Sequence, residues 1–188
     1  MMRWALLLTL TALVACGSSP KTEFYTLVSV KPTTTARIDA KGPPLQVGRV
    51  DLPSTLDRTA LVIQGSDAHV IVSDRDRWAG PLDTLVRQAL SDDLRARLGT
   101  AAVLAPGDPA PPSKVRQLLV VIERFSADSA GRVVLEADWT VGSGNPPRPG
   151  ATHHERVEEN AGSTQGGSVA AAMSRALGLL ADAIAQTL

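Results

Sequence analysis

Few side chains in this 188-residue chain are spaced for chemistry. The densest cluster is His153-His154-Glu155, whose residue types suit a zinc site. Adjacent side chains on a strand point to opposite faces, so the two imidazoles do not readily bind one ion, and we predict no metal site. The carboxylate pairs Asp92-Asp93 and Glu158-Glu159 are expected in solvated stretches, which does not favour acid–base catalysis. Since the chain also lacks a Gly-x-Ser-x-Gly motif, we predict no enzyme activity and no cofactor.

The only cysteine, Cys16, occupies a position with a specific chemistry. Arg3 supplies a positive charge ahead of the uncharged run 4–15, whose 12 residues fall short of the roughly 20 that span a bilayer. A basic start followed by a short apolar run is typical of a secretory signal. The run ends Leu13-Val14-Ala15-Cys16, which resembles the bacterial lipobox.

The lipobox resemblance implies that the signal peptide is cut before Cys16. It also implies that the Cys16 thiol and the new amino terminus are both acylated, with fatty acids such as palmitate. Three acyl chains anchor a protein far more firmly than one. Gly17 stands where an aspartate would resemble an inner-membrane retention signal, which favours the outer membrane. We therefore expect a signal peptide at 1–15, an acylated tether at 16–22, and covalent lipid on Cys16 as the only attached group.

Composition excludes two further classes of protein. Lys+Arg and Asp+Glu both number 19, so the chain lacks the basic excess that nucleic-acid binding requires. A hydrophobic content of 44% with zero formal net charge argues against intrinsic disorder. The length fits one domain, which we place at 23–188 and expect to face the periplasm.

Helical periodicity predicts two helices. The first begins near Pro81 and stops before Gly99; its i,i+4 pairs Asp83/Arg87 and Asp93/Arg97 are expected to face solvent. The second runs from an N-cap at Ser168 to Leu188 and is apolar enough to be packed on more than one side.

Apolar runs predict the strands, which together with the two helices make an α+β domain. The run 118–122 is continuously apolar, which favours a central strand covered on both faces. The run 132–141 alternates and has a solvated face, and Asp128–Gly131 supplies a hairpin turn between the two. Further strands are expected at 24–28, 45–50, 60–64 and 69–73, with an edge strand at 153–159.

Three segments carry a family resemblance. They are Phe24-Tyr25-Thr26-Leu27, the run 47–58 (VGRVDLPSTLDR), and Arg77-Trp78-Ala79-Gly80-Pro81-Leu82. In order and spacing they resemble the PqiC family of ABC-transport auxiliary lipoproteins. Its pattern has a strand, Leu-Pro, a Leu-Asp-Arg corner, and Arg-Trp-Ala-x-Pro-Leu opening a helix. The chain departs at Thr55, where an aromatic residue is common, and at Gly80, where an acidic one is common.

The resemblance implies an α/β fold, an α+β mixed-sheet sandwich: a single compact domain whose mixed β-sheet is packed by two long helices. It also implies a non-enzymatic outer-membrane lipoprotein subunit of an MCE-type intermembrane transport system. Such systems move phospholipid or other hydrophobic molecules and support membrane integrity. The implied partners are an MCE-type envelope-spanning protein and other copies of the chain in a homo-oligomeric ring.

The motif residues have two readings. In one they are structural: Leu52 and Pro53 end a strand, and Trp78 beside Pro81 packs the start of the helix against the sheet. In the other they dock a partner, since Arg and Trp are favoured interface anchors. The residues concerned are Leu52, Pro53, Leu56, Asp57, Arg58, Arg77, Trp78 and Pro81. A periplasmic lipid-binding carrier and an envelope hydrolase, with His153 and His154 as its best candidates, remain alternative functions.

Overall fold

The computed structural model of the chain describes residues 21–32, 42–109, 115–143 and 148–188. The predicted signal peptide, Cys16 and most of the tether lie outside the described residues. The predicted boundaries at residues 15/16 and 22/23 therefore stay predictions.

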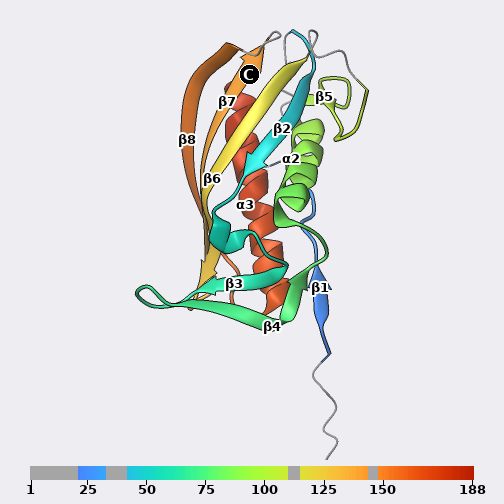
Figure 1. The fold of residues 1–188 in the computed structure, drawn as a ribbon. Helices are drawn as coiled ribbons and strands as arrows, with labels where there is room; N and C mark the ends of the chain where they lie inside the picture. Colours follow the sequence, from blue (N-terminus) through green and yellow to red (C-terminus); the bar gives the residue numbers. More distant parts are fainter. Residues whose placement is uncertain (1–20, 33–41, 110–114, 144–147) are drawn as a thin grey trace, which may run out of the picture.

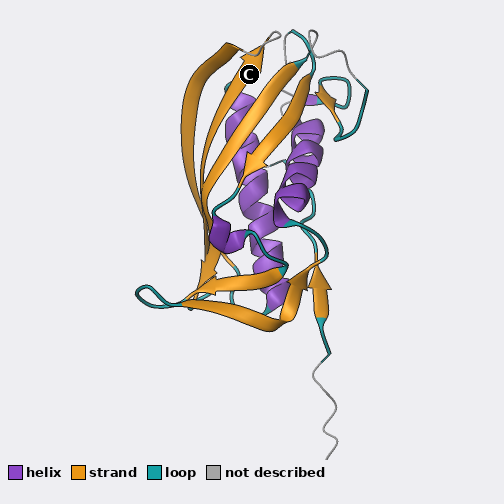
Figure 2. Cartoon of the chain, viewed as in Figure 1, coloured by secondary structure: helices purple, strands orange, loops and turns teal. Residues whose placement is uncertain are grey.

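One sheet and two helices form two layers (Figures 1 and 2). This confirms the expected mixed-sheet fold. Within the described residues the sheet has eight strands: β1 (Glu23–Tyr25), β2 (Leu45–Asp51), β3 (Ala60–Gln64), β4 (Val70–Trp78), β5 (Val103–Leu104), β6 (Arg116–Asp128), β7 (Arg132–Ser143) and β8 (Arg148–Asn160). The helices are α2 (Leu82–Leu98) and α3 (Gly166–Gln186), and a 3-10 turn, η2 (Ser54–Leu56), follows β2.

Strand β6 is the central strand of the sheet. One edge of β6 pairs antiparallel with β7, which pairs antiparallel with β8. The other edge is shared: its first half pairs parallel with β2, and its last residues pair parallel with β3. Beyond β3 lie β4 and then β1. Two separate groups of strands therefore share this edge of β6, one that begins with β2 and one that begins with β3. The turn of the β6–β7 hairpin places Gly131 at φ 79°, a conformation that glycine adopts without strain.

The prediction that 118–122 is covered on both faces is wrong. Leu118 and Val120 are buried beneath the helices, but Leu119 and Val121 on the opposite face are 43% and 47% exposed. Both helices lie on the same face of the sheet (Figure 2). Periodicity could not reveal this, because the chain has apolar side chains on both faces of β6 while only one face is covered.

The boundaries of α2 agree with the sequence. Pro81 immediately precedes it, and Gly99 ends it at φ 94°. Helix α3 begins at Gly166, two residues before the prediction, and its N-cap is Gln165 without a side-chain cap, so Ser168 is not the cap. The start is fixed by packing, because a Cβ on Gly166 would lie 2.5 Å from Cε2 of Tyr25.

The apolar side chains of α3 are buried against the sheet and α2, as expected for a helix packed on more than one side. Within the described ranges, α3 is the one helix long and apolar enough to cross a membrane by length and composition. Since 67% of that stretch is buried inside the fold, α3 is a core helix.

The predicted strand 24–28 ends early, at Tyr25, because the chain then leaves the sheet and runs along the helices. The backbone N–H of Val28 donates to Oγ of Ser174 on α3 (3.2 Å). Two residues later, Val30 packs against Gly178, where a Cβ would lie 2.1 Å from Cγ2 of Val30. We call residues 28–30 the strap. Because Gly178 has no side chain, it leaves the space on α3 that Val30 of the strap occupies.

Gly178→Ala tests this close approach. In an ordinary helix interior the substitution stabilises by about 1 kcal/mol. Here we expect it to lower the free energy of unfolding by about 1–3 kcal/mol, because the new methyl group overpacks against Val30. Chemical denaturation measures the change, and hydrogen exchange at residues 28–30 should rise with it.

The double variant Gly178→Ala/Val30→Ala removes the clashing methyl groups of Val30 and should recover part of the loss. Equal stability of the single and double variants would show that the strap does not occupy this space.

Candidate functional site

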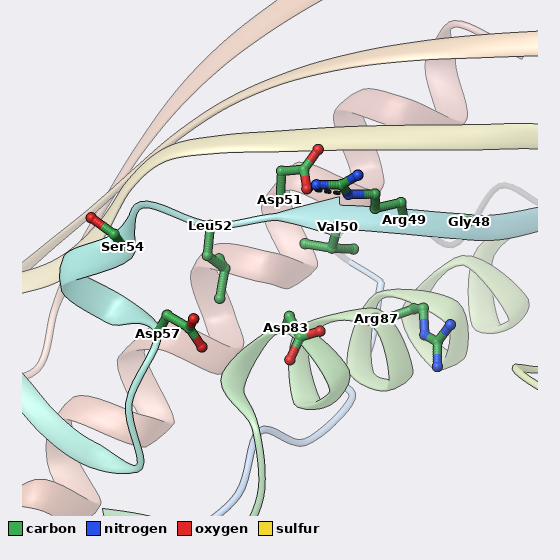
Figure 3. Close-up of a pocket in the computed structure, with 9 residues that line it drawn as sticks. All are labelled: Gly48, Arg49, Val50, Asp51, Leu52, Ser54, Asp57, Asp83 and Arg87. Atoms are coloured by element: carbon green, nitrogen blue, oxygen red, sulfur yellow. Dashed lines mark hydrogen bonds and ion pairs between the residues drawn. The ribbon is translucent and has the colours of Figure 1, made fainter.

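A surface cavity of about 590 Å³ lies where β2 ends, beside η2 and the first turns of α2. It is lined by Gly48, Arg49, Val50, Asp51, Leu52, Ser54, Asp57, Asp83 and Arg87. Seven of these residues, all except Asp83 and Arg87, belong to the segment 47–58 that carries the family resemblance. In Figure 3, Leu52 extends between Asp57 and Asp83. We call this cavity the β2–α2 groove.

Local sequence explains how the groove forms. Pro53, at φ −56°, precedes η2, and its carbonyl accepts a hydrogen bond from the N–H of Leu56 (2.9 Å). Leu56 is 7% exposed, so its burial holds the turn against the core. Asp57 follows as the C-terminal cap residue of η2 and its side chain stays exposed at the groove. The Leu-Asp-Arg corner thus buries its leucine and presents its aspartate.

The groove carries charges of both signs around one apolar side chain. Nε of Arg49 donates to Oδ1 of Asp51, which neutralises that pair. Asp83 lies in the first turn of α2, where the helix dipole favours a carboxylate. Asp57 comes from the opposite wall, and Arg87 lies one turn beyond Asp83. Two carboxylates beside Leu52 suit a basic and partly apolar segment of another protein.

Of the other motif residues, Trp78 and Pro81 have structural roles. Trp78 is 3% exposed, and its backbone N–H donates to the carbonyl of Thr59 (2.6 Å), which closes the loop between η2 and β3. Pro81 is the N-cap residue of α2. Arg77 lies on β4 between its partners on β1 and β3, and Arg58 is exposed just after Asp57.

The motif therefore separates into two groups. Leu52 and Asp57 line the groove, and Arg58 is exposed beside it. Trp78, Leu56, Pro53 and Pro81 shape the corner. Any docking role falls on the first group, because the side chains of Trp78 and Leu56 are buried.

The histidines predicted to point apart do so. His153 stacks on the Trp139 ring, with centroids 5.4 Å apart and planes at 18°. Nδ1 of His154 lies 2.7 Å from Oδ1 of Asp138 on the other face. Over the described part of the chain, no three His, Cys, Asp or Glu side chains gather as metal ligands.

A buried ion cluster joins α2, α3 and the strap, and sequence reasoning missed it. Asp93 and Arg97 were expected to face solvent, yet they are 0% and 4% exposed. Nε of Arg97 donates to Oδ1 of Asp182 on α3 (2.7 Å), and Nη2 donates to the Gly178 carbonyl (2.7 Å). We call Asp93, Arg97 and Asp182 the clamp.

Asp93 connects the clamp to the strap. Its Oδ1 accepts from Oγ of Ser29 (2.9 Å) and from the N–H of Val30 (2.8 Å), and Nη1 of Arg97 lies 3.5 Å away. Its Oδ2 is buried without a hydrogen-bond partner among the described residues. Burial raises the pKa of Asp93, and the hydrogen bonds from Val30 and Ser29 and the charge of Arg97 only partly offset this.

The sequence did contain a signal for the clamp. Asp93 and Arg97 lie four and eight residues after Ala89, a member of the buried stripe, so they continue that face of α2. Asp182 and Arg175 are the only charged residues in α3. A charged residue on the apolar face of one helix, such as Arg97, indicates a buried ion pair when a second helix carries an opposite charge, such as Asp182.

Comparisons with known proteins agree with the fold and the motif. The model of the ABC-type transport auxiliary lipoprotein component matches residues 25–185. The chain is 26% identical over 141 residues to the intermembrane transport lipoprotein PqiC of Escherichia coli K12, covering 74% of this chain and 73% of that protein.

Two solved structures share the fold. A crystal structure of an uncharacterised protein has a TM-score of 0.72 at 19% identity, covering 89% of this chain and 98% of that one. A crystal structure of a Xanthomonas campestris protein has a TM-score of 0.68 at 19% identity, covering 88% and 94%.

Arg97→Met tests the clamp. Removing the guanidinium leaves Asp93 buried without its cation, so the free energy of unfolding should fall by about 3–5 kcal/mol in chemical denaturation. Arg95→Met, on the same helix but partly exposed, serves as the control and should change it by less than about 0.5 kcal/mol. Equal effects of the two substitutions would contradict the clamp.

The raised pKa of Asp93 predicts a pH effect with a definite sign. The folded state holds the proton more tightly than the unfolded state, so the contribution of Asp93 to stability is full below the ordinary Asp pKa of about 4 and is lost as pH rises above it. Asp93→Asn retains an acceptor for Ser29 and Val30 but does not titrate. The stability of the native chain relative to Asp93→Asn should therefore decline as pH rises from about 4, and a rising difference would contradict this assignment.

Proposed function

Because the chain belongs to the family of ABC-type transport auxiliary lipoproteins, we propose that it is a non-enzymatic lipoprotein subunit of an MCE-type intermembrane transport system. In this proposal Cys16 carries the acyl chains, the outer membrane holds the anchor, and the folded domain faces the periplasm. The domain docks the envelope-spanning MCE-type protein, which carries phospholipid or another hydrophobic molecule. This supports membrane integrity.

One observation carries the proposal. The family match spans residues 25–185, nearly the whole described domain, and it begins nine residues after the lipobox cysteine. The protein named an intermembrane transport lipoprotein in E. coli K12 aligns over three quarters of the chain. Its name supplies the transport role proposed here.

The β2–α2 groove is the docking site in this proposal. It combines the exposed carboxylates of Asp57 and Asp83 with the apolar side chain of Leu52, all at the corner formed by the family motif. Interfaces of this kind gain specificity from charge complementarity around an apolar centre. The partner segment is therefore expected to carry a basic side chain next to an apolar one. Self-association of the chain in a ring is also part of the proposal.

Loss of the anchor should change the distribution of the protein among membranes. We expect the native chain to incorporate labelled palmitate and to fractionate with the outer membrane. Cys16→Ala should lose the label and leave the outer-membrane fraction, whereas the neighbouring control Ser18→Ala should behave like the native chain. Native-like labelling of Cys16→Ala would contradict the anchor.

Charge reversal in the groove should weaken docking. Asp57→Lys places a cation where the proposal puts a basic partner segment, so the yield of an MCE-type protein in a crosslinked affinity pull-down from intact cells should fall about tenfold. Asp92→Lys, a reversal on α2 outside the groove, is the matched control and should retain the native yield. Equal yields from both variants would exclude the groove as the docking site.

A further inference from the structure

The end of the molecule nearest the tether exposes apolar side chains. The described residues include six exposed large hydrophobic side chains: Phe24, Val28, Ile71, Val72, Leu119 and Val121. Three of them, Phe24, Ile71 and Val72, lie on the neighbouring strands β1 and β4. These strands form the end of the molecule where α3 starts, opposite the C-terminus (Figure 1).

Phe24 is the most exposed of the six, at 66%. Alternation along the extended segment explains why. Tyr25 points toward the start of α3, where its ring meets Gly166, and Leu27 is buried at 7% exposure. Phe24 therefore points away from the core, although an exposed aromatic ring is unfavourable in water.

The short segment between Cys16 and Phe24 keeps Phe24 close to the lipid anchor. Eight residues separate Phe24 from Cys16, a reach of at most about 26 Å when fully extended. Other exposed apolar residues, such as Leu119 and Val121, lie in the half of β6 that pairs with β2, farther from β1 and β4 (Figure 1).

The charges around Phe24 are suited to a lipid surface. Lys21 and Arg75 line the cavity at the start of α3, and Arg77 is the neighbour of Phe24 in the β1–β4 register. Three carboxylates lie nearby: Glu23 and Asp76, which both accept from the Tyr25 hydroxyl, and Asp74, exposed next to Arg75 on β4. Within the described residues, no carboxylate forms an ion pair with these three cations.

We infer that this end of the domain rests on the phospholipid membrane that holds the anchor, with Phe24 inserted at the level of the headgroups. Lys21, Arg75 and Arg77 contact lipid phosphates around it. An aromatic ring flanked by long cationic side chains matches the boundary between headgroups and acyl chains. This inference rests on the proposed acylation of Cys16, and it orients the β2–α2 groove relative to the membrane.

A tryptophan at position 24 reports the insertion. Trp78 and Trp139 are each 3% exposed, so Phe24→Trp adds one exposed fluorophore to the acylated chain. The acylated protein, which has lost Trp4 with its signal peptide, is purified in detergent and reconstituted into vesicles of phosphatidylcholine and phosphatidylglycerol with brominated acyl chains. Leu119→Trp, exposed on the open sheet face, is the control. We expect bromolipid to quench Phe24→Trp several-fold more than Leu119→Trp.

Flotation of the vesicles separates the two ways in which the inference can fail. If both variants float with the vesicles but are quenched equally, the anchor stands and the orientation is wrong. If neither variant floats, the acylation itself is refuted and the inference fails with it. Unfolding curves that match the native chain show that both tryptophans leave the fold intact.

Discussion

The helical layer depends on Arg97. Its guanidinium bridges Asp182 on α3 and Asp93 on its own helix, and it also binds the Gly178 carbonyl. Asp93 and Arg97 are almost fully buried, whereas the Asp182 side chain is 17% exposed. Because a charge is costly to bury alone, Asp93 and Arg97 must be buried together. The clamp therefore fixes how α2 lies on α3, and through Ser29 and Val30 it holds the segment that connects the tether to the rest of the domain.

This arrangement gives the tether a firm attachment. A chain held at the membrane by acyl groups transmits its position to the domain only if the first residues after the tether are fixed. Here β1 joins the sheet at β4, and the strap is bound by Ser174 and Asp93 from two helices. Consequently the β2–α2 groove, built on α2, is held in a constant relation to the point where the chain leaves the domain.

Much of the fold could be predicted from the sequence, and the failures have a common physical cause. Pro81, Gly99 and the apolar stripe defined α2 because helix ends and amphipathic faces are local properties. The β6–β7 hairpin followed from Asp128–Gly131 for the same reason. The exposure of Leu119 and Val121 depends instead on which sheet face the helices cover, and the burial of Asp93 and Arg97 depends on a residue 85 positions away. In the candidate site, the Leu-Asp-Arg corner could be identified from the sequence. Asp83 and Arg87 could not, because they reach the groove only through the packing of α2 beside η2.

A site-specific crosslink from the groove tests the central claim most directly. A photoreactive amino acid replaces Ser54, an exposed residue at the rim of the groove, and intact cells producing the acylated chain are irradiated. We expect the main covalent product to contain an MCE-type envelope protein, identified by mass spectrometry. Products that contain only other copies of the chain or cell-wall enzymes would contradict it.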